Sequence, residues 1–223
     1  MLFDTKGHNF ERDIIMLNVR WYLSYKLSYR DLEEMAAERG LEVDHTTIYR
    51  WVVKFTPELE KAVRLLKRPA GKSWRLDETY IKVKGQWKYL YRAVDKEGNT
   101  VDYLLTAQRD RKAAKRFICK AIKSNVEPIK INIDKSGANT AGINDYNYDE
   151  GLDIEIRENK YLNNMIEQDH RLIKLLCRAT LGFKSFKTAR ITIGGFESMR
   201  MIRKRQVKAE GTSSAEVFYS MTA

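Results

Sequence analysis

Residues 74–108 contain three consecutive segments in which apolar and polar residues alternate, and this stretch narrows the possible folds most. The segments are WRLDETYIKVKG, QWKYLYRAVD and TVDYLLTAQ. A glycine-containing turn separates the first two, and DKEGN at 95–99 separates the last two. Alternation with a period of two indicates strands, and such short turns join antiparallel neighbours. The sequence therefore predicts three antiparallel strands here.

The segments that follow complete a mixed α/β domain. Asp110 precedes the helical pattern RKAAKRFICKAIKSN, Pro128 precedes the short apolar strand IKINID, and DIEIREN at 153–159 alternates again. A helix is expected from about Asn164 to Arg178. Residues 135–152 show no firm pattern, although the order of elements requires a helix there. The order βββ-α-β-α-β-α predicts a ribonuclease H-like mixed sheet.

The first 70 residues have helical periodicity instead. Apolar residues at helical spacing predict a helix over about residues 11–25. A second helix is expected between Ser28, a good N-cap with Asp31 three residues later, and Gly40. Asp44 is the candidate N-cap of a third helix, and Thr56-Pro57 is expected to start a further helix up to residue 66. An all-α module therefore precedes the mixed sheet.

Two short capped helices joined by a turn at residues 40–43 fit a helix-turn-helix. The second helix would enter the major groove and present donors to phosphates and base edges. A plain helical hairpin with a polar outer face fits the same pattern, and Trp51 is expected in the core rather than on DNA. The residues predicted to contact DNA from this helix are His45, Thr46, Thr47, Tyr49, Arg50 and Lys54.

The charge of the chain favours a polyanionic partner. There are 41 Lys and Arg residues against 30 Asp and Glu residues, a net charge of +11. Nucleic acid is the first expectation for such a surplus and an anionic membrane the second. No run approaches the length that spans a bilayer and the N-terminus lacks a signal-peptide pattern, so we expect a cytoplasmic protein with no membrane partner. Cys119 and Cys177 have no CxxC spacing, which disfavours structural zinc.

Three acids stand where the chemistry of a phosphodiester enzyme is expected. Asp77 lies in the first strand, Asp134 at the end of the short apolar strand, and Glu167 on the late helix. Three carboxylates brought together would repel one another without cations, and Mg²⁺ bridges carboxylates to phosphates. Two such ions suit in-line attack on a phosphodiester. We therefore interpret the three acids as a candidate metal site.

Each acid also has an ordinary structural interpretation. Glu78 alternates with Asp77 onto the opposite face of the strand, and the pattern alone does not choose between them. Asp134 could cap the next helix, and Glu167 could pair with Arg171 one turn later. Further acids compete for any catalytic role: Asp95, Asp102, Asp110 and Asp169.

Cations follow Glu167 along one face of its helix. Arg171, Lys174 and Arg178 stand at i+4, i+7 and i+11. A carboxylate followed by a line of cations suits a metal ligand beside a track of phosphates. His170 at i+3 could contact DNA, or it could be a packing residue.

Several long motifs resemble those of a known family. WRLDETYIKVKGQWKYLYRAVDKEGNTVDYLL, KYLNNMIEQDHRLIK and GFESMRMIRK closely resemble the bacterial insertion-sequence transposases of the insertion sequence six group. These are DDE transposases with an integrase-like catalytic core, and the resemblance runs from about His8 to Gln206. It implies a helix-turn-helix DNA-binding module over 1–70, a catalytic domain over 71–206 and a C-terminal tail over 207–223. Gly194-Gly195 interrupts the expected C-terminal helix of that domain, and the tail carries no recognisable motif.

The resemblance also implies roles for individual residues. It selects Asp77 rather than Glu78 as the first acid, with Asp134 second and Glu167 third, as catalytic residues and ligands of two Mg²⁺ or Mn²⁺ ions. Residues around the third acid are expected to hold DNA: Lys160, Asn163, Asn164, His170, Arg171 and Lys174.

The implied activity is transposition. The enzyme would bind the terminal inverted repeats of an element, cleave double-stranded DNA and join 3′-hydroxyl ends to a target. It would act as at least a homodimer, at the bacterial nucleoid. Two other functions fit the same residues: a divalent-metal nuclease of the same fold, and a regulator that binds DNA without catalysis.

Overall fold

The computed structural model describes residues 3–180 and 182–223, except for the side chain of Lys160. The chain forms two compact units, Pro69–Lys174 and Met1–Arg68 together with Leu175–Ala223. The domain boundaries expected at 70 and 206 stay a prediction. Within the second compact unit, the helices after residue 174 pack on the N-terminal helices.

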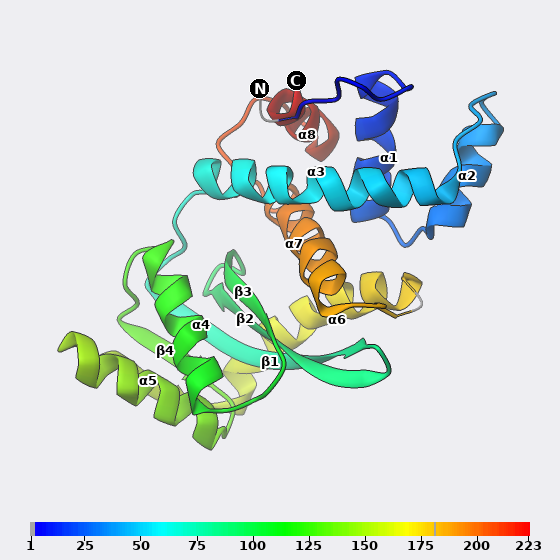
Figure 1. The fold of residues 1–223 in the computed structure, drawn as a ribbon. Helices are drawn as coiled ribbons and strands as arrows, with labels where there is room; N and C mark the ends of the chain where they lie inside the picture. The colour runs from blue at the N-terminus through cyan, green and yellow to red at the C-terminus, as the bar shows by residue number, and fades with distance from the viewer. Residues whose placement is uncertain (1–2, 181) are drawn as a thin grey trace. The chain divides into compact units, whose positions relative to one another are not determined.

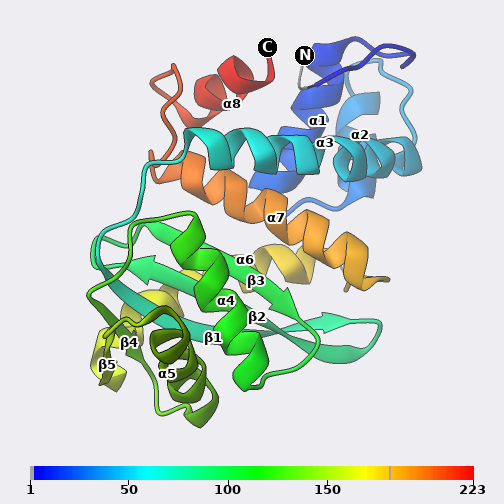
Figure 2. The ribbon, with the colours of Figure 1, turned by 60° about the vertical axis from the view of Figure 1, so that its left-hand side comes forward.

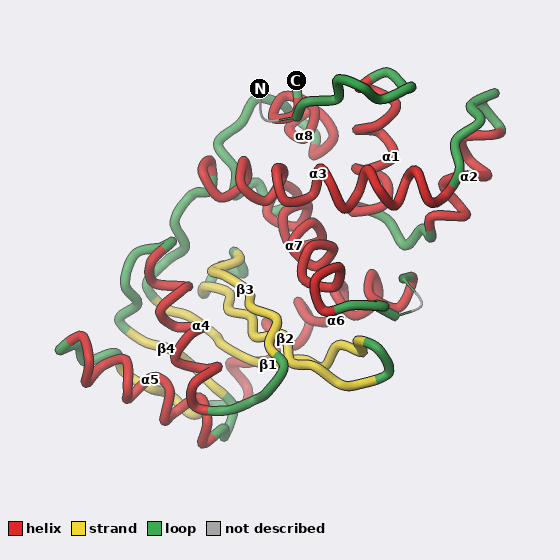
Figure 3. Tube along the Cα trace, in the orientation of Figure 1, coloured by secondary structure: helices red, strands yellow, loops and turns green. Residues whose placement is uncertain are grey.

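A five-stranded sheet organises the unit Pro69–Lys174. The strands are β1 Ser73–Val83, β2 Gln86–Asp95, β3 Thr100–Thr106, β4 Lys130–Ile133 and β5 Glu155–Glu158. Their spatial order is β3-β2-β1-β4-β5, and Figure 3 draws the strands in yellow. The first three strands are antiparallel neighbours, as predicted, while β4 runs parallel to β1 and β5 parallel to β4. Lys84 and Gly85 both have positive φ, which matches the tight turn that the β1–β2 hairpin needs.

Helices cover both faces of this sheet. They are α4 Arg111–Lys123, α5 Gly137–Glu150, the 3₁₀ turn η1 Lys160–Asn163 and α6 Asn164–Ala179. Helices α4 and α5 cover one face, and the first part of α6 lies on the other (Figures 1 and 2). Trp74, Leu76, Ile131 and Ile133 point from the sheet into the core beneath α4 and α5. The ribonuclease H-like fold predicted from the order of elements is therefore confirmed.

Helix α5 occupies the stretch in which the sequence showed no firm pattern. Its contact with α4 is too close for larger side chains, because a Cβ on Gly142 would lie 2.6 Å from Ala114 Cβ and 2.8 Å from Lys115 N. Ion pairs of Arg111 with Asp145 and of Lys115 with Asp149 border this contact. Small and polar residues on both sides of α5 explain why periodicity did not reveal the helix.

The second unit is entirely helical. Its helices are α1 Arg12–Ser24, α2 Tyr29–Ala37, α3 His45–Leu66, α7 Phe186–Arg203 and α8 Ser214–Thr222. The capping box expected at the start of α2 is present, since Asp31 N donates to Ser28 Oγ and Ser28 N donates to Asp31 Oδ2. Asp44 caps α3 as expected, and Trp51 is buried. Helix α8 gives structure to the predicted tail.

Two predicted helix breaks are wrong. Helix α3 continues through Pro57 as one helix, because buried residues on both sides of the proline, Phe55 and Leu59, share one apolar stripe. Helix α7 continues through Gly194-Gly195. A Cβ on Gly195 would lie 2.5 Å from Leu23 Cδ2 and 2.7 Å from Thr56 Cγ2, so this glycine permits a close crossing with α1 and α3.

No helix in the described part of the chain is long and apolar enough to cross a membrane.

Candidate active site

Asp77 and Asp134 occupy neighbouring positions on two parallel strands. Leu76 of β1 pairs with Ile133 of β4, and each acid is the next residue along its strand. Adjacent strands lie about 4.8 Å apart, so the two carboxylates start from neighbouring backbone positions. Asp134 is exposed, and the side chain of Asp77 is 23% exposed. The sheet therefore places two accessible carboxylates at the carboxyl end of β4.

The structure distinguishes Asp77 from Glu78. The side chain of Glu78 is only 4% exposed and accepts a hydrogen bond from Arg109 Nε at 3.1 Å, on the opposite face of β1. Burial raises the pKa of Glu78, and the nearby Arg109 opposes this shift. Glu78 thus has a structural partner, whereas Asp77 faces α6.

His170 of α6 is held between Asp77 and Arg92. Its Nε2 lies 3.2 Å from Asp77 Oδ2, and its Nδ1 lies 3.3 Å from Arg92 Nη1. Because a guanidinium can only donate, Nδ1 accepts from Arg92 and the ring proton sits on Nε2, which donates to Asp77. Burial is the main cause that lowers the pKa of His170, which favours this neutral form. One carboxylate oxygen of Asp77 is thereby oriented by the protein.

A buried ion pair fixes α6 on the sheet. Arg92 of β2, which is 1% exposed, pairs with Asp169 of α6. Arg92 is also the cross-strand neighbour of Asp77. Glu167 lies in the first turn of α6, three residues before His170, and is exposed. Among the described residues Glu167 forms no ion pair, so the alternative of a helix salt bridge with Arg171 is not realised.

The competing acids all stabilise the fold. Asp95 accepts hydrogen bonds from the backbone of Gly71 and Asn99, and Asp110 caps α4 by accepting from Ala113 N. Asp102 pairs with Lys120 at 2.8 Å. The cap of α5 is Ser136 rather than Asp134. Among the described residues, Asp77 has the bond from His170 and Asp134 accepts only from the backbone of the next residue, Lys135 N, at 2.8 Å, while Glu167 has no such partner.

Asp77, Asp134 and Glu167 have the ligand chemistry of a Mg²⁺ site, but their carboxylates are not gathered closely enough to surround one ion. They offer carboxylate oxygens, the ligands that Mg²⁺ and Mn²⁺ prefer. Their ligand atoms are not all within 4.8 Å of one another; in the described part of the chain, that condition is met by Glu33, Asp44 and His45. In this second group His45 Nδ1 lies 3.1 Å from Glu33 Oε2 and 3.4 Å from Asp44 Oδ2.

The residues predicted to read DNA from the helix-turn-helix are at the start of α3. Thr46, Tyr49, Arg50 and Lys54 are exposed, whereas His45 and Thr47 are partly buried. Several already have partners: the Thr46 backbone donates to Asp44, and Lys54 Nζ donates to Asp4 O at 3.1 Å. Arg50 has no such partner among the described residues.

The residues predicted to hold DNA around Glu167 divide into two sets. Asn164, Arg171 and Lys174 are exposed on α6. Asn163 and His170 are buried, at 1% and 4% exposure, which differs from the expected contact with DNA. Asn163 instead accepts from Asn132 Nδ2 at 2.6 Å and so holds η1 on the sheet. The side chain of Lys160 lies outside the described residues.

Sequence reasoning missed the residues that position the acids. Arg92 and Asp169 are far apart in the chain, and no local pattern links them. Arg75 stands two residues before Asp77, and Asn132 two residues before Asp134. Strand alternation alone could have placed both on the face of the acids.

The five-stranded mixed sheet with helices on both faces is the fold of ribonuclease H-like polynucleotidyl transferases. Residues 71–206 match the family model for the DDE domain. The transposase for the insertion sequence-like element IS431mec of Staphylococcus aureus is 42% identical over 197 residues, which cover 88% of this chain and 87% of the relative. The transposase for insertion sequence element IS257 in transposon Tn4003, also from Staphylococcus aureus, is 41% identical over the same shares. The chain belongs to the DDE transposases of the insertion sequence six group.

Solved structures of retroviral integrase cores are also similar. The HTLV-2 integrase catalytic core domain in complex with magnesium is 13% identical, with a TM-score of 0.46 over 70% of this chain and 99% of that chain. The catalytic core domain of BIV integrase is 16% identical, with a TM-score of 0.46 over 66% of this chain and 93% of that chain.

Proposed function

We propose that this transposase binds the terminal inverted repeats of its element, cleaves the DNA and joins the 3′-hydroxyl ends to target DNA. The observation that carries this proposal is the placement of Asp77 and Asp134 at neighbouring positions on parallel strands, while the competing acids are used in the fold. Glu167, exposed on the helix that His170 anchors to Asp77, is the third proposed ligand.

Asp77, Asp134 and Glu167 would hold two Mg²⁺ or Mn²⁺ ions. When bound, these ions supply activation of the attacking oxygen and stabilisation of the leaving oxygen. His170 keeps Asp77 oriented through Nε2, and its neutral form leaves the carboxylate its full charge. Arg92 and Asp169 keep α6, and with it Glu167, on the sheet.

The proposed reaction has two steps. Water attacks a phosphorus at the element end, a P–O bond breaks, and a 3′-hydroxyl is released. That hydroxyl then attacks a phosphorus of the target, forming a new phosphodiester while the target's own 3′-oxygen leaves. Arg171, Lys174 and Asn164 are exposed beside Glu167, where they would hold phosphates of the reacting strands.

DNA recognition is assigned to the helical module. We propose that α3 enters the major groove with Arg50 and Tyr49 facing base edges and Thr46 facing a phosphate. His45, Thr47 and Lys54 would support this contact. Because the two ends of an element must be processed together, we propose at least a homodimer, which acts on nucleoid DNA in the bacterial cytoplasm.

A strand-transfer assay tests the proposal. Purified protein is mixed with Mg²⁺ and a target plasmid, in one reaction with pre-cleaved end DNA and in a parallel reaction with uncleaved end DNA. Joined products support transposition. Cutting of uncleaved end DNA without joining supports a nuclease, and binding without cutting or joining supports a regulator; either result would overturn the proposed reaction.

A further inference from the structure

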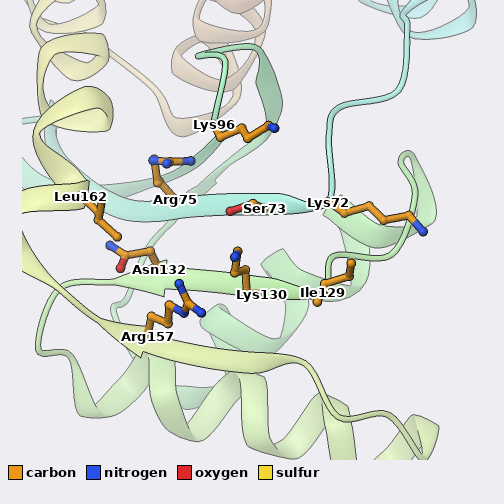
Figure 4. Close-up of a pocket in the computed structure, with 9 residues that line it drawn as sticks. All are labelled: Lys72, Ser73, Arg75, Lys96, Ile129, Lys130, Asn132, Arg157 and Leu162. Carbon is orange, nitrogen blue, oxygen red and sulfur yellow. The ribbon is translucent and has the colours of Figure 1, made fainter.

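A hollow on the face of the sheet that carries the first part of α6 is lined by several cations. It has a volume of about 450 Å³ and lies over β1, β4 and β5 (Figure 4). Its charged lining residues are all cations: Lys72, Arg75, Lys96, Lys130 and Arg157. Ser73, Ile129, Asn132 and Leu162 complete the lining. Five cations around one hollow, with no carboxylate lining it, favour an anionic ligand.

The register of the sheet places this hollow beside the catalytic acids. Arg75, Asn132 and Arg157 are register partners across β1, β4 and β5. Asp77 and Asp134 stand two residues further along β1 and β4. Two residues of strand span about 6.6 Å, and residues two apart point to the same face. Arg75 and Arg157, with Asn132 between them, therefore lie one step from the acids on the same side of the sheet, and Lys130, the register partner of Ser73, lies one step further back.

Arg75 carries a buried nitrogen that no other described residue pairs with. Its Nη1 is buried and has no hydrogen-bond partner among the described residues. A buried guanidinium nitrogen without an acceptor is costly, because it has lost its water and gained nothing in exchange. A phosphate oxygen satisfies such a group well, since the planar guanidinium donates two parallel bonds to phosphate.

The neighbouring cations, Lys130 and Arg157, both lie close to Glu155. Lys130 has no ion pair among the described residues, although Glu155 is its register partner on β5. Arg157 pairs with Glu155 at 2.7 Å, but both side chains are about half exposed, so water competes with this pair and a phosphate can replace it. Three cations from three adjacent strands thus converge on one space.

We propose that Arg75, Lys130 and Arg157 bind a backbone phosphate of the DNA strand whose scissile phosphate lies at Asp77 and Asp134. This inference rests on the proposed function. A strand that presents one phosphate to the acids would present a nearby phosphate to the row of cations behind them. The site positions the strand without reading its sequence.

Binding measurements test the site separately from catalysis. Binding of end DNA to the full chain is followed by fluorescence anisotropy without divalent metal, over a series of salt concentrations. Arg75→Gln and, as a second variant on a different strand, Lys130→Gln should each weaken binding several-fold. Each variant should also reduce the slope of log affinity against log salt concentration by about 0.9 in magnitude, because one phosphate contact is lost. Arg116→Gln is the matched control, an exposed arginine on α4, and should leave both quantities unchanged.

A neutral-phosphate scan locates the contact. Single phosphates around the cleavage position are replaced by uncharged methylphosphonates. A methylphosphonate at one position should weaken the binding of that DNA by the wild type and by Arg116→Gln. The same methylphosphonate should not further weaken binding by Arg75→Gln or Lys130→Gln, since these variants have already lost the contact.

The outcomes separate the two proposals. If the wild type joins DNA ends but Arg75→Gln and Lys130→Gln bind with the wild-type salt slope, the phosphate site is wrong and the proposed function stands. If Arg75→Gln and Lys130→Gln lower the affinity by the same factor for every methylphosphonate duplex, the cations attract DNA without contacting one particular phosphate. The proposed phosphate site is then also wrong. If inorganic phosphate protects the wild type against thermal unfolding but the scan shows no special position, the hollow binds a free anion and not the strand. If the wild type neither binds nor joins DNA, both proposals fail.

Discussion

His170 donates a hydrogen bond from Nε2 to Asp77 Oδ2 over 3.2 Å, although 93 residues separate the two in the chain. Arg92 sets the direction of this bond, since it occupies the other ring nitrogen. The contact joins the helix that carries the third acid to the strand that carries the first.

The three acids should be needed for chemistry and not for DNA binding. Asp77→Asn, Asp134→Asn and Glu167→Gln keep size and polarity but remove the charge that holds a divalent cation, so cleavage and joining should fall at least about 1,000-fold, or roughly 4 kcal/mol in activation free energy. Gel-shift assays should show nearly unchanged end binding. Asp149→Asn, which changes an exposed acid on α5, is the control. A variant that cuts DNA normally would show that its residue is not a ligand.

His170 should act by positioning Asp77. His170→Ala removes the donor to Asp77 and leaves Arg92 with an unfilled bond, which should cost about 1–3 kcal/mol of folding stability. The more specific expectation is a higher Mg²⁺ concentration for half-maximal cleavage, measured by metal titration. His170→Gln can donate to Asp77 and should recover part of the metal affinity. Equal metal dependence in all three proteins would limit His170 to a packing role.

Arg50 should contribute to recognition of the element ends. It is exposed at the start of α3 and has no partner among the described residues. Arg50→Ala should lower the affinity for end DNA by about 1–3 kcal/mol while binding of unrelated DNA changes less. Competition binding with end and unrelated duplexes measures the ratio of the two affinities. Lys61→Ala, an exposed cation further along α3, is the control; an unchanged ratio for Arg50→Ala would remove Arg50 from base reading.

Gly195 should be essential for packing of the helical unit. Gly195→Ala places a methyl group 2.5 Å from Leu23 Cδ2, so it should destabilise the protein by about 1–3 kcal/mol in urea unfolding followed by circular dichroism. Gly137→Ala is the matched control, since it is also a helical glycine but a Cβ there meets nothing within 4 Å. That control should be neutral or stabilising because alanine favours the helix. Equal stability of the two variants would contradict the close crossing.

Local patterns in the sequence determined most of the elements. Alternation predicted the three antiparallel strands, and Ser28, Asp44 and Asp110 marked helix starts because their side chains bond nearby backbone amides. Helix α5 could not be read in this way, since glycine and small residues pack it against α4 rather than an apolar stripe. The breaks expected at Pro57 and Gly194-Gly195 failed for a related reason: packing on both sides outweighed the local preference.

The sequence by itself, through its motifs and the family they resemble, determined which three acids to consider and which family the chain belongs to. Only the tertiary structure gave a physical reason for preferring Asp77 to Glu78, because it gave Glu78 the partner Arg109. Only the tertiary structure gave structural partners to the competing acids Asp95, Asp102, Asp110 and Asp169. It also turned Asn163 and His170 inward and placed Arg75 beside the acids. The physical reason is that hydrogen bonds and charge pairs form between residues distant in the chain, and their partners are chosen by strand register and helix packing.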